Sequence, residues 1–146
     1  FHQPCDVNAL ATAALYHDAS EILTGDLPTP IKYHNAEIMS AYHAVEDLAV
    51  QKLLGMLPPE LRETYADVLA EDKDGDIYPL VKAADKLSAY IKCIEERKAG
   101  NNEFLSAEAQ TRAALEASPL PEVQYFLEHF IPAFERDLDE LGAIGQ

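Results

Sequence analysis

The sequence predicts an all-α protein that folds as one domain over residues 1–146. In most segments, apolar residues recur at steps of three and four, which is the spacing of a helix with one buried face. Prolines and glycines separate these segments, and no segment alternates apolar and polar residues for long enough to indicate a strand. Because 48% of the 146 residues are hydrophobic, the chain can form a core without disulfide bonds or a structural metal.

The first predicted helix follows Asp6, because an aspartate there can accept hydrogen bonds from the free N–H groups of the first turn. The apolar face of this helix consists of Val7, Leu10, Ala11, Ala14, Leu15 and Ile22. Gly25, Pro28 and Pro30 then end the helical pattern and predict a turn. A longer helix is predicted over residues 35–56. Its apolar face consists of Ile38, Tyr42, Val45, Leu48, Ala49, Leu53 and Met56.

The second half of the chain predicts four more helices. A short helix begins near Pro59, since proline fits a first helical turn, and residues 71–76 then form a polar loop. The next helix covers residues 80–94 and is closed by Gly100, and Asn102 caps the helix after it. The residues that face the core in these helices are Leu61, Tyr65 and Val68, then Leu80, Val81, Ala84, Leu87, Ser88, Ile91 and Ile94, then Phe104, Ala107, Thr111 and Leu115. After Pro119 and Pro121, a last helix carries Phe126, Phe130, Ala133, Phe134, Leu138 and Leu141.

The chain is strongly acidic, with 26 Asp and Glu residues against 11 Lys and Arg residues and a formal net charge of −15. Because binding to a nucleic-acid backbone depends on Lys and Arg side chains that displace counterions, this balance excludes a general nucleic-acid-binding protein. It also argues against binding to an anionic membrane surface. A small phosphorylated substrate remains compatible with the charge if a metal ion or a local cation screens it.

The two cysteines, Cys5 and Cys93, are too few and too far apart for a disulfide framework or a zinc knuckle. We interpret them as reduced thiols, which predicts a cytoplasmic protein. No segment has enough consecutive apolar residues to span a bilayer, and no signal peptide opens the chain. No phosphate-binding glycine loop, serine-nucleophile motif or cysteine–histidine pair stands out either.

The first candidate site is the pair His17 and Asp18, near the end of the first predicted helix. Adjacent side chains diverge by roughly 100° around a helix axis, but both can lean toward one ion beyond the helix edge. An imidazole nitrogen and a carboxylate oxygen together suit a divalent transition metal. Glu21, four residues after His17 on the same face, is within reach of a water on that ion. A chance pair of polar residues at a helix end is the alternative, and spacing alone leaves it open.

The second candidate is Asp85, which interrupts an apolar face between Val81 and Ser88 in a later helix. Small neighbouring residues let another helix or an ion come close to this carboxylate. As a ligand from a distant helix, Asp85 could complete a metal site of the kind found in the core of helix bundles. The alternative is a partly exposed aspartate paired with Lys82 or Lys86.

Five stretches of the chain match the motifs of one known family. They are Tyr16-His17-Asp18-Ala19-Ser20-Glu21, Leu23-Thr24-Gly25-Asp26-Leu27-Pro28-Thr29-Pro30, Lys82-Ala83-Ala84-Asp85, Tyr90-Ile91-Lys92-Cys93 and Gly100-Asn101-Asn102-Glu103-Phe104-Leu105. From about Val7 to the last helix, the chain resembles the HD-domain phosphohydrolases of the bacterial 5′-deoxynucleotidase (YfbR-like) type. The His-Asp pair alone is unspecific, whereas the Gly-Asp-Leu-Pro-Thr-Pro motif is highly specific.

The resemblance implies an HD-domain helical bundle, in agreement with the helices predicted from periodicity. It implies a 5′-deoxynucleotidase, a phosphoric monoester hydrolase that removes the 5′-phosphate from deoxyribonucleoside monophosphates with one divalent metal ion such as cobalt or manganese. It assigns His17, Asp18 and Asp85 as metal ligands and Glu21 as the catalytic residue beside the attacking water. The residues it implies at the nucleotide are Asp18, Asp26, Leu27, Pro28, Thr29 and Asp85. The expected partner is therefore a small nucleotide, not a polymeric nucleic acid or a membrane.

The chain departs from the family pattern at its N-terminus. The family has a further metal-binding histidine on a helix upstream of the His-Asp pair, and an arginine–tryptophan pair that orients phosphate and sugar. The chain begins with Phe1 and contains no tryptophan. We therefore expect an HD domain that lacks its N-terminal helices, and this puts metal binding and activity of the chain by itself in question.

Two other functions stay open at this point. An HD phosphohydrolase could act on another nucleotide, such as a triphosphate, a cyclic nucleotide or an alarmone. A non-catalytic acidic helical module that binds a protein partner is the alternative from a different class. Phe126, Phe130 and Phe134 fit a homodimer interface and the core of a monomer equally well.

Overall fold

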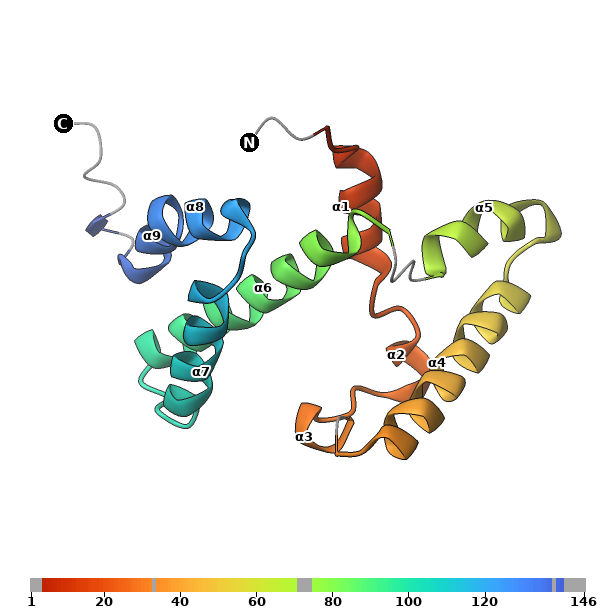
Figure 1. Cartoon of the computed structure of the whole chain (residues 1–146), viewed down its shortest axis with the longest axis horizontal. Coiled ribbons are helices and arrows are strands. Elements are labelled where there is room, and N and C mark those ends of the chain that lie inside the picture. The colour runs from red at the N-terminus through yellow and green to blue at the C-terminus, as the bar shows by residue number, and fades with distance from the viewer. Residues whose placement is uncertain (1–3, 33, 71–74, 138, 141–146) are drawn as a thin grey trace. The chain divides into compact units, whose positions relative to one another are not determined.

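The structure is a computed structural model of the chain, and it describes residues 4–32, 34–70, 75–137 and 139–140, without the side chains of Thr29 and Pro30. These residues form α-helices joined by turns and contain no strand, so the predicted all-α class is confirmed (Figure 1). The chain divides into an N-terminal unit, Cys5–Val81, and a C-terminal unit that contains Lys82–Gln146 and the first four residues. The single domain expected over residues 1–146 stays a prediction. In the described part of the chain, no helix is both long and apolar enough to cross a membrane.

The N-terminal unit begins with α1, Val7–Tyr16, which starts where the sequence predicts. The Asp6 carboxylate accepts the N–H groups of Asn8 and Ala9, both at 3.0 Å, and so caps the first turn. The prediction that this helix continues to Ile22 is wrong. The chain instead turns after Tyr16 and forms a separate short helix α2, Glu21–Thr24.

The turn between α1 and α2 is held by hydrogen bonds that span three residues rather than four. The Ala19 N–H donates to the Tyr16 carbonyl, and the Glu21 N–H donates to the Asp18 carbonyl, both at 2.9 Å. Such bonds tighten the backbone and rotate the residues that follow. The apolar face predicted across both helices is therefore broken, and Val7, Leu15 and Ile22 are exposed.

The predicted break after α2 is confirmed at Gly25, which has a φ of +71°. The chain then forms α3, Thr29–Lys32, and the long helix α4, Ala36–Met56. Asn35 caps α4, because its side-chain oxygen accepts the Ile38 N–H at 2.8 Å. The predicted bounds of α4 are confirmed, but its predicted apolar face is wrong in part. Ala49 is buried, whereas Val45, Leu48 and Met56 are exposed.

The helix predicted near Pro59 is confirmed as α5, Pro59–Leu69, with proline in its first turn. Arg62 joins α5 to the end of α4: its Nε donates to the Leu57 carbonyl at 2.9 Å and its guanidinium also donates to the Gly55 carbonyl at 3.2 Å. These bonds satisfy carbonyls that the helix itself leaves without partners. Residues 71–74 of the predicted loop lie outside the described residues.

Helix α6, Tyr78–Lys98, belongs to both units, since Tyr78–Val81 is part of the N-terminal unit and the rest of the helix is part of the C-terminal unit. Its predicted end at Gly100 is confirmed. Gly100 has a φ of +86° and donates its N–H to the Arg97 carbonyl, while the Asn101 N–H donates to the Glu96 carbonyl. This pair of bonds is the Schellman motif, which favours glycine because the backbone must be left-handed.

The C-terminal unit continues with α7, Leu105–Glu116, then α8, Pro121–His129, and α9, Ile131–Glu135. Two predictions are wrong here. The N-cap residue of α7 is Phe104 rather than Asn102, and no side chain caps that end. The last helix is divided at Phe130, because Pro132 in the first turn of α9 cannot donate the hydrogen bond that a continuous helix needs. Leu138 and Leu141 lie outside the described residues.

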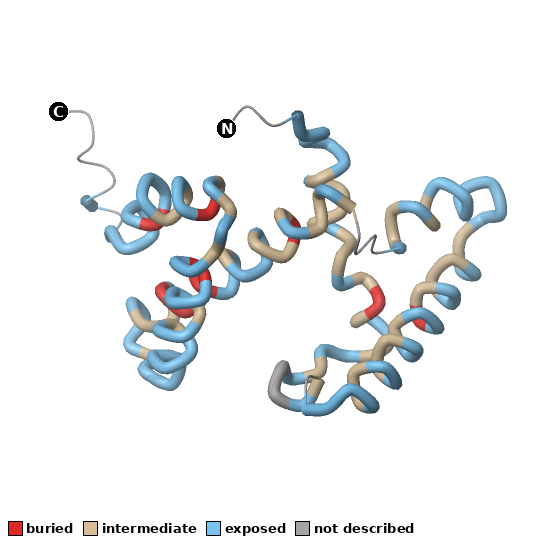
Figure 2. The backbone as a smooth tube through the Cα atoms, viewed as in Figure 1, coloured by how far each residue is buried: buried red, intermediate tan, exposed pale blue. Residues whose placement is uncertain are grey.

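The core of the C-terminal unit is formed by large side chains from α6, α7, α8 and α9. They are Tyr90, Ile94, Leu115, Val123 and Ile131. Figure 2 shows buried residues on α6, and Tyr90 and Ile94 are the α6 residues that pack against the core residues of α7, α8 and α9. Phe126 packs against this core, whereas Phe130 and Phe134 are 49% and 38% exposed. Phe126 therefore contributes to the core, and a homodimer interface that includes Phe130 and Phe134 stays a prediction.

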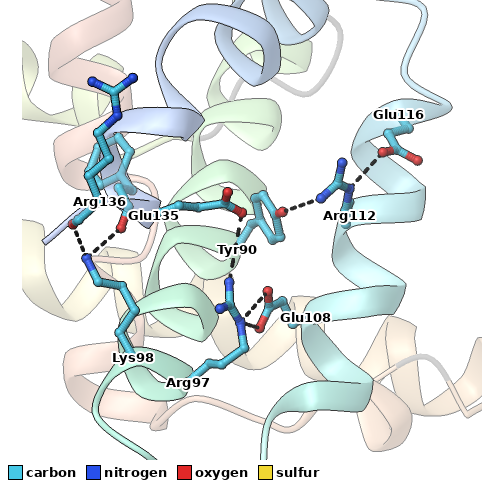
Figure 3. A network of polar contacts seen from close by, with 9 residues as sticks. Tyr90, Arg97, Lys98, Glu108, Arg112, Glu116, Glu135 and Arg136 are labelled. Atoms are coloured by element: carbon cyan, nitrogen blue, oxygen red, sulfur yellow. Dashed lines mark hydrogen bonds and ion pairs between the residues drawn. The ribbon is translucent and has the colours of Figure 1, made fainter. Parts of the chain in front are cut away.

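Ion pairs and hydrogen bonds also connect the helices of the C-terminal unit (Figure 3). The Arg97 guanidinium on α6 donates to the Glu108 carboxylate on α7 at 2.9 Å, and Lys98 donates to the carbonyls of Phe134 and Arg136 at the end of α9. Arg112 on α7 pairs with Glu116 at 2.8 Å. The network therefore connects α6 to both α7 and α9 by charge-assisted bonds.

We expect Ile94→Ala to lower the free energy of unfolding by about 2–5 kcal/mol, because the truncated side chain leaves a cavity in the core. Ile94 is 0% exposed, so nothing from solvent fills the space. Leu105→Ala is the control, since Leu105 is 46% exposed on α7, and it should cost no more than about 0.5 kcal/mol. Denaturant unfolding followed by circular dichroism measures both, and equal losses would contradict the placement of Ile94 at the centre of the core.

Candidate metal and nucleotide site

His17 lies directly after α1, on the turn that leads to α2, and its side chain is only 15% exposed. Its Nδ1 atom is 2.8 Å from the Ala14 carbonyl oxygen. Because a carbonyl can only accept a hydrogen bond, Nδ1 carries the proton, and in the neutral ring Nε2 carries the lone pair. A backbone carbonyl that holds one ring nitrogen in this way commonly orients the other nitrogen toward a metal.

Asp18 presents a carboxylate oxygen to this nitrogen. The distance from His17 Nε2 to Asp18 Oδ2 is 3.0 Å, and the Asp18 side chain is 52% exposed. The turn after Tyr16 therefore brings together two side chains that diverge on a continuous helix. A nitrogen lone pair and a carboxylate oxygen at this separation attract only when a proton or a metal cation lies with them, and the mixed N/O donor set suits a divalent transition metal.

Glu21 begins α2 and is partly buried. Burial raises the pKa of its carboxyl group, and the negative charges of Asp18, Asp26 and Glu46 raise it further. The positive charge of Lys32 lowers it. A carboxyl group whose pKa is raised toward neutral pH is suited to exchange a proton with a water molecule or a leaving group.

The loop after α2 contains the other residues that the sequence predicts at the nucleotide. Asp26 and Pro28 are exposed and Leu27 is half-buried. Thr29 begins α3, and its side chain lies outside the described residues. Asp26 contributes to the electrostatic environment of Glu21, so the loop and α2 belong to one acidic region of the N-terminal unit.

Three residues at this loop were missed by the sequence reasoning: Lys32, Tyr42 and Glu46. The Tyr42 hydroxyl donates to the Gly25 carbonyl at 3.0 Å, and the Lys32 ammonium pairs with the Glu46 carboxylate at 2.8 Å. The pattern counted Tyr42 among the core residues of the long helix. A signal was available, because a tyrosine hydroxyl at a partly buried position normally has a hydrogen-bond partner.

A cavity of about 420 Å³ lies beside His17 within the N-terminal unit. Residues from α1, from the end of α5 and from the first turn of α6 line it. They are Asp6, Asn8, Ala9, Thr12, Ala13, His17, Asp67, Val68, Leu69, Ala70, Ile77, Tyr78 and Val81. His17 is thus at the edge of a hollow large enough for a small molecule.

Asp85 lies on α6 in the C-terminal unit, one helical turn after the buried residue Val81. The apolar face that Asp85 is predicted to interrupt is buried at Val81, whereas Asp85 and Ser88 are exposed. The grouping of Asp85 with His17 and Asp18 stays a prediction.

The model of the family described as 5′-deoxynucleotidase YfbR-like matches residues 1–134. The chain belongs to the YfbR-like 5′-deoxynucleotidase family. The chain is 52% identical over 140 residues to the 5′-deoxynucleotidase YfbR of Shigella flexneri serotype 5b and to that of Escherichia coli K12. Each alignment covers 94% of this chain and 70% of the relative.

The fold of this YfbR-like chain is similar to that of a solved HD-domain phosphohydrolase from Listeria innocua, with a TM-score of 0.74 and 27% identity. The match covers 90% of this chain, which spans 65% of the length of the Listeria protein. Together with the family model, it confirms the expected family, the HD-domain fold and the enzyme class. HD-domain enzymes depend on metal, and the donor atoms of His17 and Asp18 agree with that dependence.

Proposed function

We propose that this YfbR-like chain removes the 5′-phosphate from deoxyribonucleoside monophosphates as part of its whole protein. The observation that carries the proposal is the orientation of His17, whose Nδ1 proton is held by the Ala14 carbonyl while Nε2 lies 3.0 Å from the Asp18 carboxylate. The names of the curated relatives supply the substrate class. The imidazole of His17 and the carboxylate of Asp18 could together hold a metal cation. Such a cation would screen the negative charge of a phosphate ester, which explains how an acidic chain can bind this substrate.

His17 Nε2 and the Asp18 carboxylate would hold one divalent ion, of which cobalt and manganese are the candidates. We propose Asp85 as the third ligand, because it follows Val81 by four residues on one face of α6 and Val81 lines the same cavity as His17. A divalent ion in such a site lowers the pKa of water and screens the charge of a phosphate group. The two carboxylates would also compensate the charge of that ion within a chain whose net charge is −15.

Glu21 is proposed as the catalytic residue. Its carboxylate would orient the attacking water and accept a proton from it, and the protonated form would return that proton to the leaving 5′-oxygen. The partial burial of Glu21 and its acidic neighbours raise the pKa of its carboxyl group, which favours such proton exchange. Neither step requires Glu21 to contact the ion.

The loop from Asp26 to Thr29 is proposed to hold the sugar and the base. The Asp26 carboxylate can accept hydrogen bonds from sugar hydroxyls, and Leu27 and Pro28 supply apolar contacts. A close fit beside C2′ would exclude ribose, because an added hydroxyl in an apolar contact loses its hydrogen bonds to water. Asp18 and Asp85 would lie nearest to the phosphate.

The proposal predicts metal-dependent phosphate release from deoxyribonucleoside monophosphates and little release from the matched ribonucleotides. The measurement is inorganic phosphate with each substrate, made together with metal analysis of the protein expressed from its complete gene. Hydrolysis of deoxynucleoside triphosphates or of cyclic nucleotides in preference to monophosphates would move the chain to another HD activity. A metal-free protein that releases no phosphate would favour the non-catalytic interaction module.

A homodimer and a cytoplasmic location complete the proposal. The rings of Phe130 and Phe134 are at the surface of the C-terminal unit, so they are available to a second copy of the chain. The cytoplasmic location is supported by the free thiols of Cys5 and Cys93.

A further inference from the structure

The Gly25–Asp26 peptide group is held in place by side chains on two helices. The Gly25 N–H donates to the Glu21 carbonyl at 2.9 Å. The Gly25 carbonyl accepts the hydroxyl of Thr24 and the hydroxyl of Tyr42, both at 3.0 Å. Because Gly25 has a φ of +71°, the chain reverses at this point, and the orientation of its carbonyl sets the direction in which Asp26 leaves the turn.

The same tyrosine also contacts the far end of the loop. The Lys32 ammonium on α3 lies 4.6 Å from the centre of the Tyr42 ring and donates to the Glu46 carboxylate at 2.8 Å. The Lys32 and Glu46 side chains are both 20% exposed, so the pair is partly shielded from water. A cation over an aromatic face and a shielded ion pair are each stronger than the same contacts in open solvent.

Tyr42 and Glu46 lie four residues apart, so they share one face of α4. With 21 residues, α4 is a much longer support than the four-residue helices α2 and α3 on either side of the loop. Short helices have little stability of their own and depend on the elements that they pack against. The face of α4 that carries Tyr42 and Glu46 is therefore what fixes both ends of the loop.

We propose that Tyr42, with the Lys32–Glu46 pair, is a positioning and specificity-determining element that holds Asp26 in the orientation needed to distinguish deoxyribose from ribose. This inference rests on the proposed function for the identity of the substrate. The hydroxyl of Tyr42 acts through the Gly25 carbonyl and not on the nucleotide. Selectivity at a sugar depends on placement to within a fraction of an ångström, so the loss of one anchoring bond is enough to alter it.

The test is Tyr42→Phe in the protein expressed from its complete gene, since this change removes only the hydroxyl. We expect kcat/KM for a deoxyribonucleoside monophosphate to fall by about 3- to 10-fold, the range for one lost hydrogen bond, and the preference over the matched ribonucleotide to fall with it. In an Asp26→Asn background, Tyr42→Phe should cause little further loss of preference, because the residue through which it acts is already altered. Tyr125→Phe, which removes the hydroxyl of an exposed tyrosine on α8 in the C-terminal unit, is the matched control and should change neither value.

Amide hydrogen exchange of residues 25–28 gives a readout that does not depend on catalysis. Exchange in this segment should be faster in Tyr42→Phe than in the wild type, and unchanged in Tyr125→Phe. Lys32→Gln should also speed exchange and reduce sugar preference, whereas Lys32→Arg keeps the charge and should retain both values. These two variants test the inference even if Tyr42→Phe is not stably folded.

Two different failures are distinguishable. If the wild type releases no phosphate from any deoxyribonucleoside monophosphate, the proposed function is rejected, and faster exchange in Tyr42→Phe still supports the anchoring role. If the wild type is active but the sugar preference and the exchange of residues 25–28 are the same in the wild type and in Tyr42→Phe, the inference is overturned.

Discussion

Replacing Asp85 with alanine is expected to abolish metal-dependent phosphate release, with a loss of about 1,000-fold or more. A bound divalent ion contributes several kcal/mol to the hydrolysis of a phosphate ester, and each 1.4 kcal/mol is about a factor of ten in rate. Asp85 follows the cavity-lining residue Val81 by one turn of α6, and it is the proposed ligand from outside the His17–Asp18 turn. The metal content of the purified protein should fall together with the activity.

The control for this variant is Glu95→Ala, which removes another exposed carboxylate from the same helix. This variant should keep both the metal and the activity. It therefore distinguishes the loss of a metal ligand from a general loss of negative charge on α6. Asp85→Ala with wild-type activity and stoichiometric metal would remove Asp85 from the ligand set. The His17–Asp18 geometry would then have to be completed by another residue.

Helix ends that are determined by residues next to them in the chain could be predicted from the sequence. Asp6 and Asn35 cap their helices with their own side chains, and Gly100 closes α6 because its backbone is left-handed. The end of α1 could not be predicted in this way, since neither glycine nor proline follows Tyr16. There, the His17 ring donates to the Ala14 carbonyl, to which the Asp18 N–H would donate in a continuous helix.

That single hydrogen bond connects the fold to the site. It occupies the carbonyl at the end of α1, and it also places the proton on Nδ1 so that Nε2 is directed at Asp18. The spacing of His17 and Asp18 predicted this pair as a candidate site but implied diverging side chains on a helix. The turn removes that difficulty by bringing the two side chains to 3.0 Å, and their assignment as metal ligands stays a prediction.

The residues around the loop from Asp26 to Thr29 show the opposite limit of sequence reasoning. Asp26 belongs to a motif that is continuous in the chain, so it could be identified from the sequence. Tyr42 and Glu46 contact the loop only because α4 folds back against α2 and α3. Their spacing is that of any helix face, and it carries no information on which segment that face will meet.

Glu21→Gln is expected to reduce kcat by about 100-fold or more, which is the lower end of the contribution of a general acid or base. The pH dependence gives the sharper test. Glu21 must be ionised to accept a proton from water, so kcat should fall as the pH decreases through its raised pKa. Burial sets that pKa first, then the charges of Asp18, Asp26, Lys32 and Glu46, of which only Lys32 lowers it.

Opposite charge changes around Glu21 should therefore move the acidic limb of the kcat profile in opposite directions. Asp26→Asn removes a negative charge and lowers the pKa of Glu21, so the limb should move to lower pH. Lys32→Gln removes the positive charge and raises that pKa, so the limb should move to higher pH. Glu46→Gln should behave as Asp26→Asn does, although it lies on α4 and has no proposed contact with the substrate. If the acidic limb moved in the same direction in all three variants, it would report the titration of a group other than Glu21. A change in substrate binding that is common to the variants would not depend on the sign of the charge removed, so opposite movements identify Glu21.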